Sequence, residues 1–285
     1  MAKPGDPPPF TGGIREGVDV TISEAAEILG VHYMTVYRYI RTGRLQARKQ
    51  GRDWRIAAED LDRFLGSAYT GAGSVDWAER LHDRVVRYDA SGAWLVVESA
   101  LISGLDVSDV YTQLMAPVLG RLGSQWEEGL MTIAEEHAAT NVCQKLIGRL
   151  GLLASQRGVS KGVVVIGCPE GEHHQLAATI ASDLFVCHGY EVINSGVDVP
   201  LPAFVHLVAN TPRLIAVGIS ATLTGNDDSV RHMIDAVRAE VPAVPIVLGG
   251  SSCHDPSLDG VNVDAVARSA IDGVALVDEL RRRSR

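Results

Sequence analysis

Apolar residues in the middle of the chain recur in a helical rhythm. From residue 76 to residue 157 they follow one another at three- and four-residue steps, which is typical of amphipathic helices that share a core. Breaks near Ser91–Gly92, residues 104–108 and Gly129 divide this stretch into about four helices. The pattern therefore predicts a four-helix bundle.

A different pattern runs from residue 160 to residue 285. A continuous apolar run at Gly162–Gly167 indicates a buried strand, and His173–His188 then has the composition of a helix. Four further short apolar runs alternate with helical segments up to the end of the sequence. Such alternation predicts a parallel α/β domain of the Rossmann or flavodoxin-like kind.

The residues before the bundle divide into three parts. Residues 1–18 are rich in proline and glycine, which predicts a disordered tail. Residues 19–66 have the pattern of a compact mixed segment, and residues 67–75 have the composition of a flexible linker. We therefore expect a multidomain protein with a small amino-terminal domain, a helical bundle and an α/β domain.

Charge is spread unevenly over a chain whose net charge is −9. Seven lysines and arginines but only one acidic residue lie between Arg38 and Arg55. A basic patch in an acidic protein points to a local site for a polyanion, although a solvated charged face has the same composition.

The amino-terminal segment Thr21–Gly43 has the pattern of two crossed helices, with Gly30 allowing a tight turn between them. The second helix presents an aromatic ring, a hydroxyl and guanidinium groups, which suit base reading in the DNA major groove. Residues 44–56 then predict a hairpin with a basic tip that would follow phosphates. The candidate DNA-binding residues are Tyr33, Thr35, Arg38, Arg41, Lys49 and Arg52.

This stretch of about 45 residues resembles the winged helix-turn-helix of the MerR and excisionase-like families. Its second helix contains Tyr37-Arg38-Tyr39, which is closer to the excisionase-like variant than to the Arg-Tyr-Tyr common in MerR proteins. The resemblance implies double-stranded operator DNA as a partner. A small helical module for protein interactions is the alternative.

Three spaced motifs mark the α/β domain. They are Glu172-x-His174-x-x-Ala177, Ser220-x-Thr222 and Gly249-Gly250. Between the first and second motifs lie 42 residues, and between the second and third lie 26. This arrangement resembles the cobalamin-binding domain of methionine synthase and its relatives, in which Asp/Glu-x-His-x-x-Gly, Ser-x-Leu/Thr and Gly-Gly occur at similar spacings.

The resemblance implies a role for each motif. His174 follows the first strand and would be the lower axial ligand of cobalt, with Glu172 holding its other ring nitrogen. The hydroxyls of Ser220 and Thr222 would border a slot for the displaced nucleotide tail, and the two glycines would let that tail approach the backbone. Ala177 stands where the family has glycine and adds one methyl group. The alternative is a flavodoxin-like domain that binds another ligand or none.

A fourth motif lies in the predicted bundle. Trp126 is followed after nine residues by Glu136-His137, which resembles the Trp-x9-Glu-His motif of the CarH family of adenosylcobalamin-dependent photoreceptor repressors. That resemblance implies that the indole packs against the upper axial adenosyl group, with Glu136 and His137 contacting it nearby. Some members carry a histidine directly after the tryptophan, where this chain has Glu127. The alternative for Trp126 is an ordinary core position in the bundle.

Together the motifs predict a cytoplasmic transcription regulator with no catalytic residues rather than an enzyme, because the chain has a DNA-binding segment and shows no further catalytic domain. By resemblance it would bind adenosylcobalamin and form a tetramer in the dark, and it would release operator DNA when light cleaves the Co–C bond. The four cysteines form no CxxC pair, and no apolar run suits a signal peptide or a membrane span. Two alternatives remain, a corrinoid protein that carries methyl groups and a regulator that senses cobalamin without light.

Overall fold

The computed structural model describes residues 19–29, 33–41, 45–51, 53–61, 64, 76–154 and 158–283. The chain divides into two compact units, one of them amino-terminal and the other formed by almost all residues from Trp77 onward. Each unit is described by itself. The predicted tail at residues 1–18 and the predicted linker at residues 67–75 lie outside the described residues.

The amino-terminal unit has two helices followed by two antiparallel strands, as the sequence predicts, while the turn predicted at Gly30 and the hairpin residue Arg52 lie outside the described residues. Thr21 and Glu24 form a capping box, in which each side chain accepts a hydrogen bond from the other residue's backbone N–H. Ala25, Val36 and Ile56 are fully buried and join both helices to the antiparallel sheet, whose strand order is β1-β3-β2. The elements are β1 (Val20–Thr21), α1 (Ile22–Leu29), α2 (Tyr33–Arg41), β2 (Arg48–Gln50) and β3 (Asp53–Ile56).

The second unit begins with the predicted bundle of four helices. The third of these helices is continuous but contains a π-helical turn, so it consists of three consecutive segments. In chain order the bundle comprises α4 (Trp77–Val85), α5 (Ala90–Ser103), the third helix as α6 (Val107–Asp109), η1 (Val110–Met115) and α7 (Ala116–Glu127), and finally α8 (Ile133–Gly151).

The first predicted break, at Ser91–Gly92, is wrong by a few residues. Both residues lie in the first turn of α5, and the chain turns at residues 86–89 instead. Tyr88 adopts a left-handed conformation with φ of 58°, and the Asp89 carboxylate accepts a hydrogen bond of 2.8 Å from the Gly92 N–H. The aspartate thus satisfies a free amide at the helix start, and this capping outweighs the low helix propensity of Ser-Gly.

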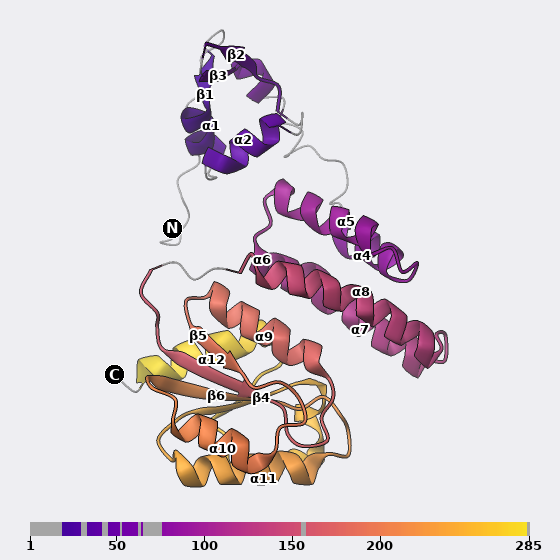
Figure 1. Cartoon of the computed structure of the whole chain (residues 1–285), viewed down its shortest axis with the longest axis vertical. Helices are drawn as coiled ribbons and strands as arrows, with labels where there is room; N and C mark the ends of the chain where they lie inside the picture. The colour runs from indigo at the N-terminus through magenta and orange to yellow at the C-terminus, as the bar shows by residue number, and fades with distance from the viewer. Residues whose placement is uncertain are drawn as a thin grey trace, which may run out of the picture. The chain divides into compact units, whose positions relative to one another are not determined.

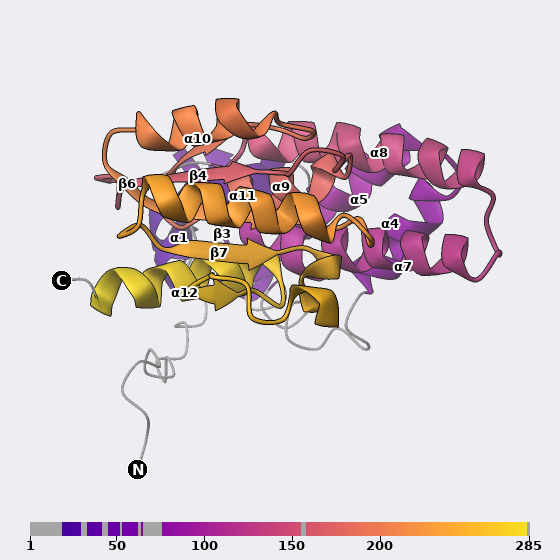
Figure 2. The same cartoon turned by 90° about the horizontal axis from the view of Figure 1, so that it is seen from below.

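The α/β part is a five-stranded parallel sheet with the order β5-β4-β6-β7-β8. Figure 1 shows two helices, α9 and α12, on one face of the sheet and two others, α10 and α11, on the opposite face. Figure 2 looks onto that opposite face and shows α10 and α11 side by side. The elements are β4 (Val163–Gly167), α9 (Gln175–Cys187), β5 (Glu191–Asn194), α10 (Leu201–Ala209), β6 (Leu214–Ser220), α11 (Asp227–Glu240), β7 (Ile246–Gly249), β8 (Ala265–Val266) and α12 (Ala270–Arg283).

The bundle packs against the α9 face of the sheet. Helix α8 contacts α9, and one buried cluster joins bundle residues such as Leu146 to α9 residues such as Leu184. The fully buried Tyr111 of the π-helical turn donates its hydroxyl hydrogen bond to Asp183 of α9. Burial raises the pKa of Asp183, whereas the bond from Tyr111 acts in the opposite direction. A polar contact therefore joins the bundle to the sheet inside an otherwise apolar interface.

The predicted fold class is confirmed, with a helix-turn-helix, a helical bundle and a doubly wound parallel sheet. Every residue of β4 is buried, as expected for a central strand covered on both faces. Strand β4 lies between β5 and β6. The chain therefore passes from β4 to β5 on one side and then returns to β6 on the other side. Ligands of such sheets bind beyond the carboxyl ends of the strands at this switch point. In the described part of the chain, no helix is long and apolar enough to cross a membrane.

Candidate cofactor site and DNA-binding surface

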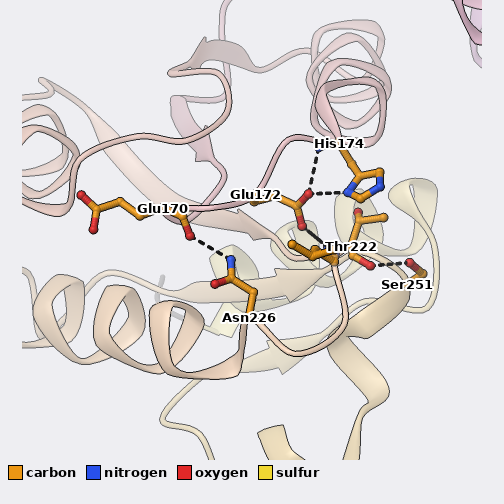
Figure 3. A network of polar contacts seen from close by, with 7 residues as sticks. Glu170, Glu172, His174, Thr222, Asn226 and Ser251 are labelled. Atoms are coloured by element: carbon orange, nitrogen blue, oxygen red, sulfur yellow. Dashed lines mark hydrogen bonds and ion pairs between the residues drawn. The ribbon is translucent and has the colours of Figure 1, made fainter. Parts of the chain in front are cut away.

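The loop after β4, residues 168–174, contains the candidate cobalt ligand and is called the histidine loop here. Its centre is Glu172, whose side chain is only 1% exposed. One carboxylate oxygen accepts from the backbone N–H and from the ring Nδ1 of His174, at 2.8 and 2.5 Å. The other accepts from the backbone N–H groups of Thr222 and Leu223, both at 2.7 Å (Figure 3). The carboxylate therefore links the histidine loop to the loop after β6.

These contacts determine the protonation of the pair. Burial by itself would raise the pKa of Glu172, but the hydrogen bonds from the His174 ring and from the Leu223, His174 and Thr222 amides lower it to about 2. A carboxylate that stays ionised can only accept hydrogen bonds, so Nδ1 of His174 must donate. The neutral imidazole then has its free lone pair on Nε2, which is the nitrogen available to a metal.

His174 itself is oriented but accessible. Its side chain is 53% exposed, and the hydrogen bond with Glu172 raises the pKa of its ring, although burial opposes this change. The helix predicted to start at His173 begins two residues later, at Gln175. Because the His174 N–H is bound by Glu172, the residue remains in the loop, at the position preceding the first turn of α9.

Two further motifs meet beside this loop. Ser220 and Gly249 are the last residues of β6 and β7 and pair across the sheet. Thr222 Oγ1 is buried and has no hydrogen-bond partner among the described residues, so it has a free donor and acceptor for a ligand. A side chain at Gly250 would place its Cβ 2.0 Å from the Ala221 carbonyl oxygen, and its φ is 105°. The backbone conformation and the close approach of Ala221 therefore require glycine at this point, beside the predicted tail slot.

Ala177, the departure from the glycine of the family motif, lies in the first turn of α9 and is half-buried. It lies three residues after His174, so the added methyl group is on the helix that follows the candidate ligand. The three motifs of the α/β domain thus come together at the carboxyl ends of β4, β6 and β7, where a ligand of this fold is expected.

The bundle motif lies at the hairpin between α7 and α8. Trp126 is 47% exposed, which argues against an ordinary core position. Glu136 accepts a hydrogen bond of 2.5 Å from Thr140, and its other oxygen lies 3.6 Å from Nε2 of the exposed His137. The charge of Glu136 contributes to raising the pKa of His174. The bundle motif and the histidine loop therefore share one electrostatic environment.

Two exposed apolar residues near this hairpin were missed by the sequence reasoning. Leu130 and Ile133 are 73% and 58% exposed, close in the chain to Trp126. Their helical spacing resembles that of buried residues, so only the structure shows that they face outward.

The DNA-binding candidates are partly described. Tyr33 at the start of α2 is 44% exposed, and Arg41 at its end is also exposed. Lys49 is exposed on β2 in the hairpin, where it pairs with Trp54 of β3. The side chains of Thr35 and Arg38, and the whole of Arg52, lie outside the described residues. The described candidates thus have the exposure that contact with DNA requires.

Comparisons with known families and proteins agree with this geometry. Residues 20–68 match a helix-turn-helix domain, and residues 77–150 and 162–275 match two models that are each described as a B12 binding domain. The matches support a cobalamin cofactor. The dimethylamine corrinoid protein of Methanosarcina barkeri is 25% identical over 206 residues, which cover 71% of this chain and 96% of that protein.

Two further matches agree. The dimethylamine corrinoid protein 1 of Methanosarcina acetivorans is 27% identical over 180 residues, which cover 62% of this chain and 84% of that protein. The solved structure of the monomethylamine corrinoid protein of Methanosarcina barkeri covers 70% of this chain and 97% of its own, with a TM-score of 0.62 and 18% identity. This structural likeness shows the fold.

The described residues fit a corrin-bound cobalt. Four positions of cobalt are filled by the corrin ring, so the protein needs to supply a single imidazole, and His174 presents one with a defined tautomer. The Thr222 hydroxyl, which has no partner among the described residues, suits the polar nucleotide tail.

Proposed function

We propose that this protein is a transcription regulator that binds adenosylcobalamin and responds to light. The observation that carries the proposal is the combination, in one chain, of a helix-turn-helix match with a helical bundle and an α/β domain that each match a B12 binding domain. The match to the dimethylamine corrinoid protein covers 96% of that relative but only 71% of this chain. The helix-turn-helix match at residues 20–68 therefore gives this chain a nucleic-acid module beyond its corrinoid part.

In this proposal the two sides of the cofactor are held by different parts of the second unit. His174, fixed by Glu172, would hold the cobalt, while Trp126, Glu136 and His137 would contact the adenosyl group. The bound cofactor supplies a Co–C bond that light can cleave. The protein responds because Trp126 then lacks its contact, and the bundle can move relative to α9. The buried Tyr111–Asp183 contact is part of the interface that this movement changes.

The output would be a change in oligomeric state. A homo-oligomer, with a tetramer as the expected form, brings several helix-turn-helix units to one operator. Individually weak DNA-binding units then bind tightly, because the later contacts are effectively intramolecular. The protein acts as a repressor in this scheme and needs no catalytic residue.

The light response has a direct test. Protein loaded with adenosylcobalamin in the dark should bind operator DNA at least about tenfold more tightly than the same sample after green light. Absorption spectra before and after illumination report the Co–C bond, and gel shifts report DNA binding. Equal DNA affinity in both samples, with a spectrum that does change, would favour a regulator that senses cobalamin without light.

DNA contact through the hairpin predicts a salt effect. Lys49→Ala should weaken binding to all duplex sequences to a similar degree and reduce the slope of log K against log salt by about one unit, because one phosphate contact is lost. Lys145→Ala, which removes an exposed lysine from the bundle, is the matched control and should leave the slope unchanged. If the two variants bind DNA alike, Lys49 does not contact phosphate.

A corrinoid methyl carrier is the second candidate, and the names of the relatives favour it. The bundle and the sheet would serve that function too. Transfer of a methyl group to or from cobalamin bound to the protein would support it. The helix-turn-helix match gives the regulator the stronger case.

A further inference from the structure

The histidine loop is held by two side chains that belong to none of the sequence motifs. The Asp198 carboxylate, from the loop after β5, accepts a hydrogen bond of 2.9 Å from the Gly171 N–H. The Asp198 N–H in turn donates to the Glu172 carbonyl oxygen at 3.0 Å. The Asn226 Nδ2, from the loop after β6, donates to the Glu170 carbonyl oxygen at 2.8 Å (Figure 3). Three consecutive residues before the candidate ligand are thus bound through their backbone groups.

The orientation of Asn226 indicates that this contact matters to the fold of the loop. Asn226 occupies the position before the first turn of α11, where asparagine normally accepts a hydrogen bond from a helix N–H. Here its side chain makes no such bond and reaches the histidine loop instead. Giving up a helix cap is unfavourable, so the contact with Glu170 replaces a locally favourable alternative.

Asp198 also has an unusual backbone. Its φ of 51° is in the left-handed region, which asparagine and aspartate tolerate better than most residues with a side chain. In this conformation the residue binds the loop twice, through its carboxylate and through its N–H. An alanine here would lose the acceptor and strain the backbone, whereas asparagine would retain both features.

We propose that Asn226 and Asp198 are positioning residues that hold the histidine loop, so that the His174 ring is in place before cobalamin arrives. This inference rests on the proposed cobalamin binding through His174. Asp198 secures the loop backbone from the β5 side, and Asn226 secures it from the β6 side, where the Glu172 carboxylate also binds the Thr222 and Leu223 amides. A ligand held in advance binds more tightly, because less conformational freedom is lost on binding.

The first test uses Asn226→Asp. This change keeps the size and the capping ability of the side chain but replaces the donor with an oxygen that faces the Glu170 carbonyl. In the cofactor-free protein, amide hydrogen exchange at residues 170–174 should become faster. Cobalamin affinity should fall by about three- to tenfold. A smaller fraction of the bound cobalamin should show the absorption spectrum of histidine-ligated cobalt. Asn210→Asp is the matched control, because Asn210 Nδ2 donates to a carbonyl of α10 at 2.8 Å, and it should change none of these values.

A second test separates positioning from general damage. In a His174→Ala background, Asn226→Asp should have little further effect on cobalamin affinity, because no ligand remains to be positioned. Asp198→Ala should reproduce the effects of Asn226→Asp, and Asp198→Asn should restore the wild-type exchange rate and spectrum.

The outcomes distinguish this inference from the proposed function. If the wild-type protein binds cobalamin through His174 and both Asn226→Asp and Asp198→Ala retain its exchange rate and spectrum, the positioning proposal is overturned and the cofactor site stands. An equal loss of affinity with and without His174 would also overturn it. Absence of histidine-ligated cobalamin in the wild-type protein would overturn both.

Discussion

Replacing His174 with alanine is expected to weaken cobalamin binding by about 100-fold or more. Losing a residue that merely orients a metal ligand typically costs 10- to 100-fold in affinity, and His174 is placed as the ligand itself. Its Nδ1 is bound to a carboxylate that is buried and ionised, so the ring orientation and tautomer are defined without the cofactor. Titration of the cofactor-free protein with cobalamin, followed by absorption, measures the affinity and shows whether a histidine is bound to cobalt.

The neighbouring histidine provides the control. His173 is exposed and differs from His174 by a single position in the chain. His173→Ala should therefore change the cobalamin affinity by less than about threefold, which corresponds to an ordinary surface substitution. A larger loss with His173→Ala than with His174→Ala would show that the motif register is wrong.

The order of the elements could be predicted from the sequence because hydrophobic periodicity determines which residues are buried. The apolar run at Gly162–Gly167 becomes the fully buried β4, and the three-and-four spacing after residue 76 becomes the bundle. Helix ends were harder to predict. The break expected at Ser91–Gly92 and the start expected at His173 are both displaced, because single carboxylates, Asp89 and Glu172, capture nearby amides.

Only the side-chain contacts of the candidate site could be predicted, because the motifs contain no information on backbone partners. The Glu172–His174 contact follows from the spacing of two residues. The other partners of Glu172 are backbone N–H groups of Thr222 and Leu223, about 50 positions away, and any residue type except proline could supply them. Parallel strands bring these loops together, so the contact depends on sheet order and leaves no signal in the amino-acid pattern.

Trp126→Ala should affect the dark oligomer more than cobalamin uptake. The indole is 47% exposed at the hairpin that also carries the exposed Leu130 and Ile133, so a large apolar surface is open to a ligand. Removing it should cost about tenfold in the preference for adenosyl- over methylcobalamin, because covering the exposed indole with the adenosyl group would contribute about 1.5 kcal/mol. His174 and the tail slot remain intact, so cobalamin should still bind.

Analytical ultracentrifugation in the dark measures this effect, with both cofactor forms and with Trp94→Ala as the control. Trp94 lies in α5 under the Arg149 guanidinium, which is 3.7 Å from its ring centroid. Its loss should leave the preference for the adenosyl form unchanged. The same oligomeric state with adenosyl- and methylcobalamin, in dark and light, would refute the switch in the wild-type protein.

The residue after Trp126 determines what we expect once the wild-type protein is illuminated. Glu127 is exposed and supplies a carboxylate where some CarH-family members have histidine. A carboxylate is a poorer partner for Co(III) than imidazole, so the upper position should be held by water or another weak ligand. The illuminated protein should therefore release cobalamin more readily, or recover its dark state when adenosylcobalamin is added. A stable spectrum with two imidazole ligands, lost in His137→Ala, would instead make His137 the upper ligand. His137 is exposed beside Glu136, so its ring is accessible to a ligand.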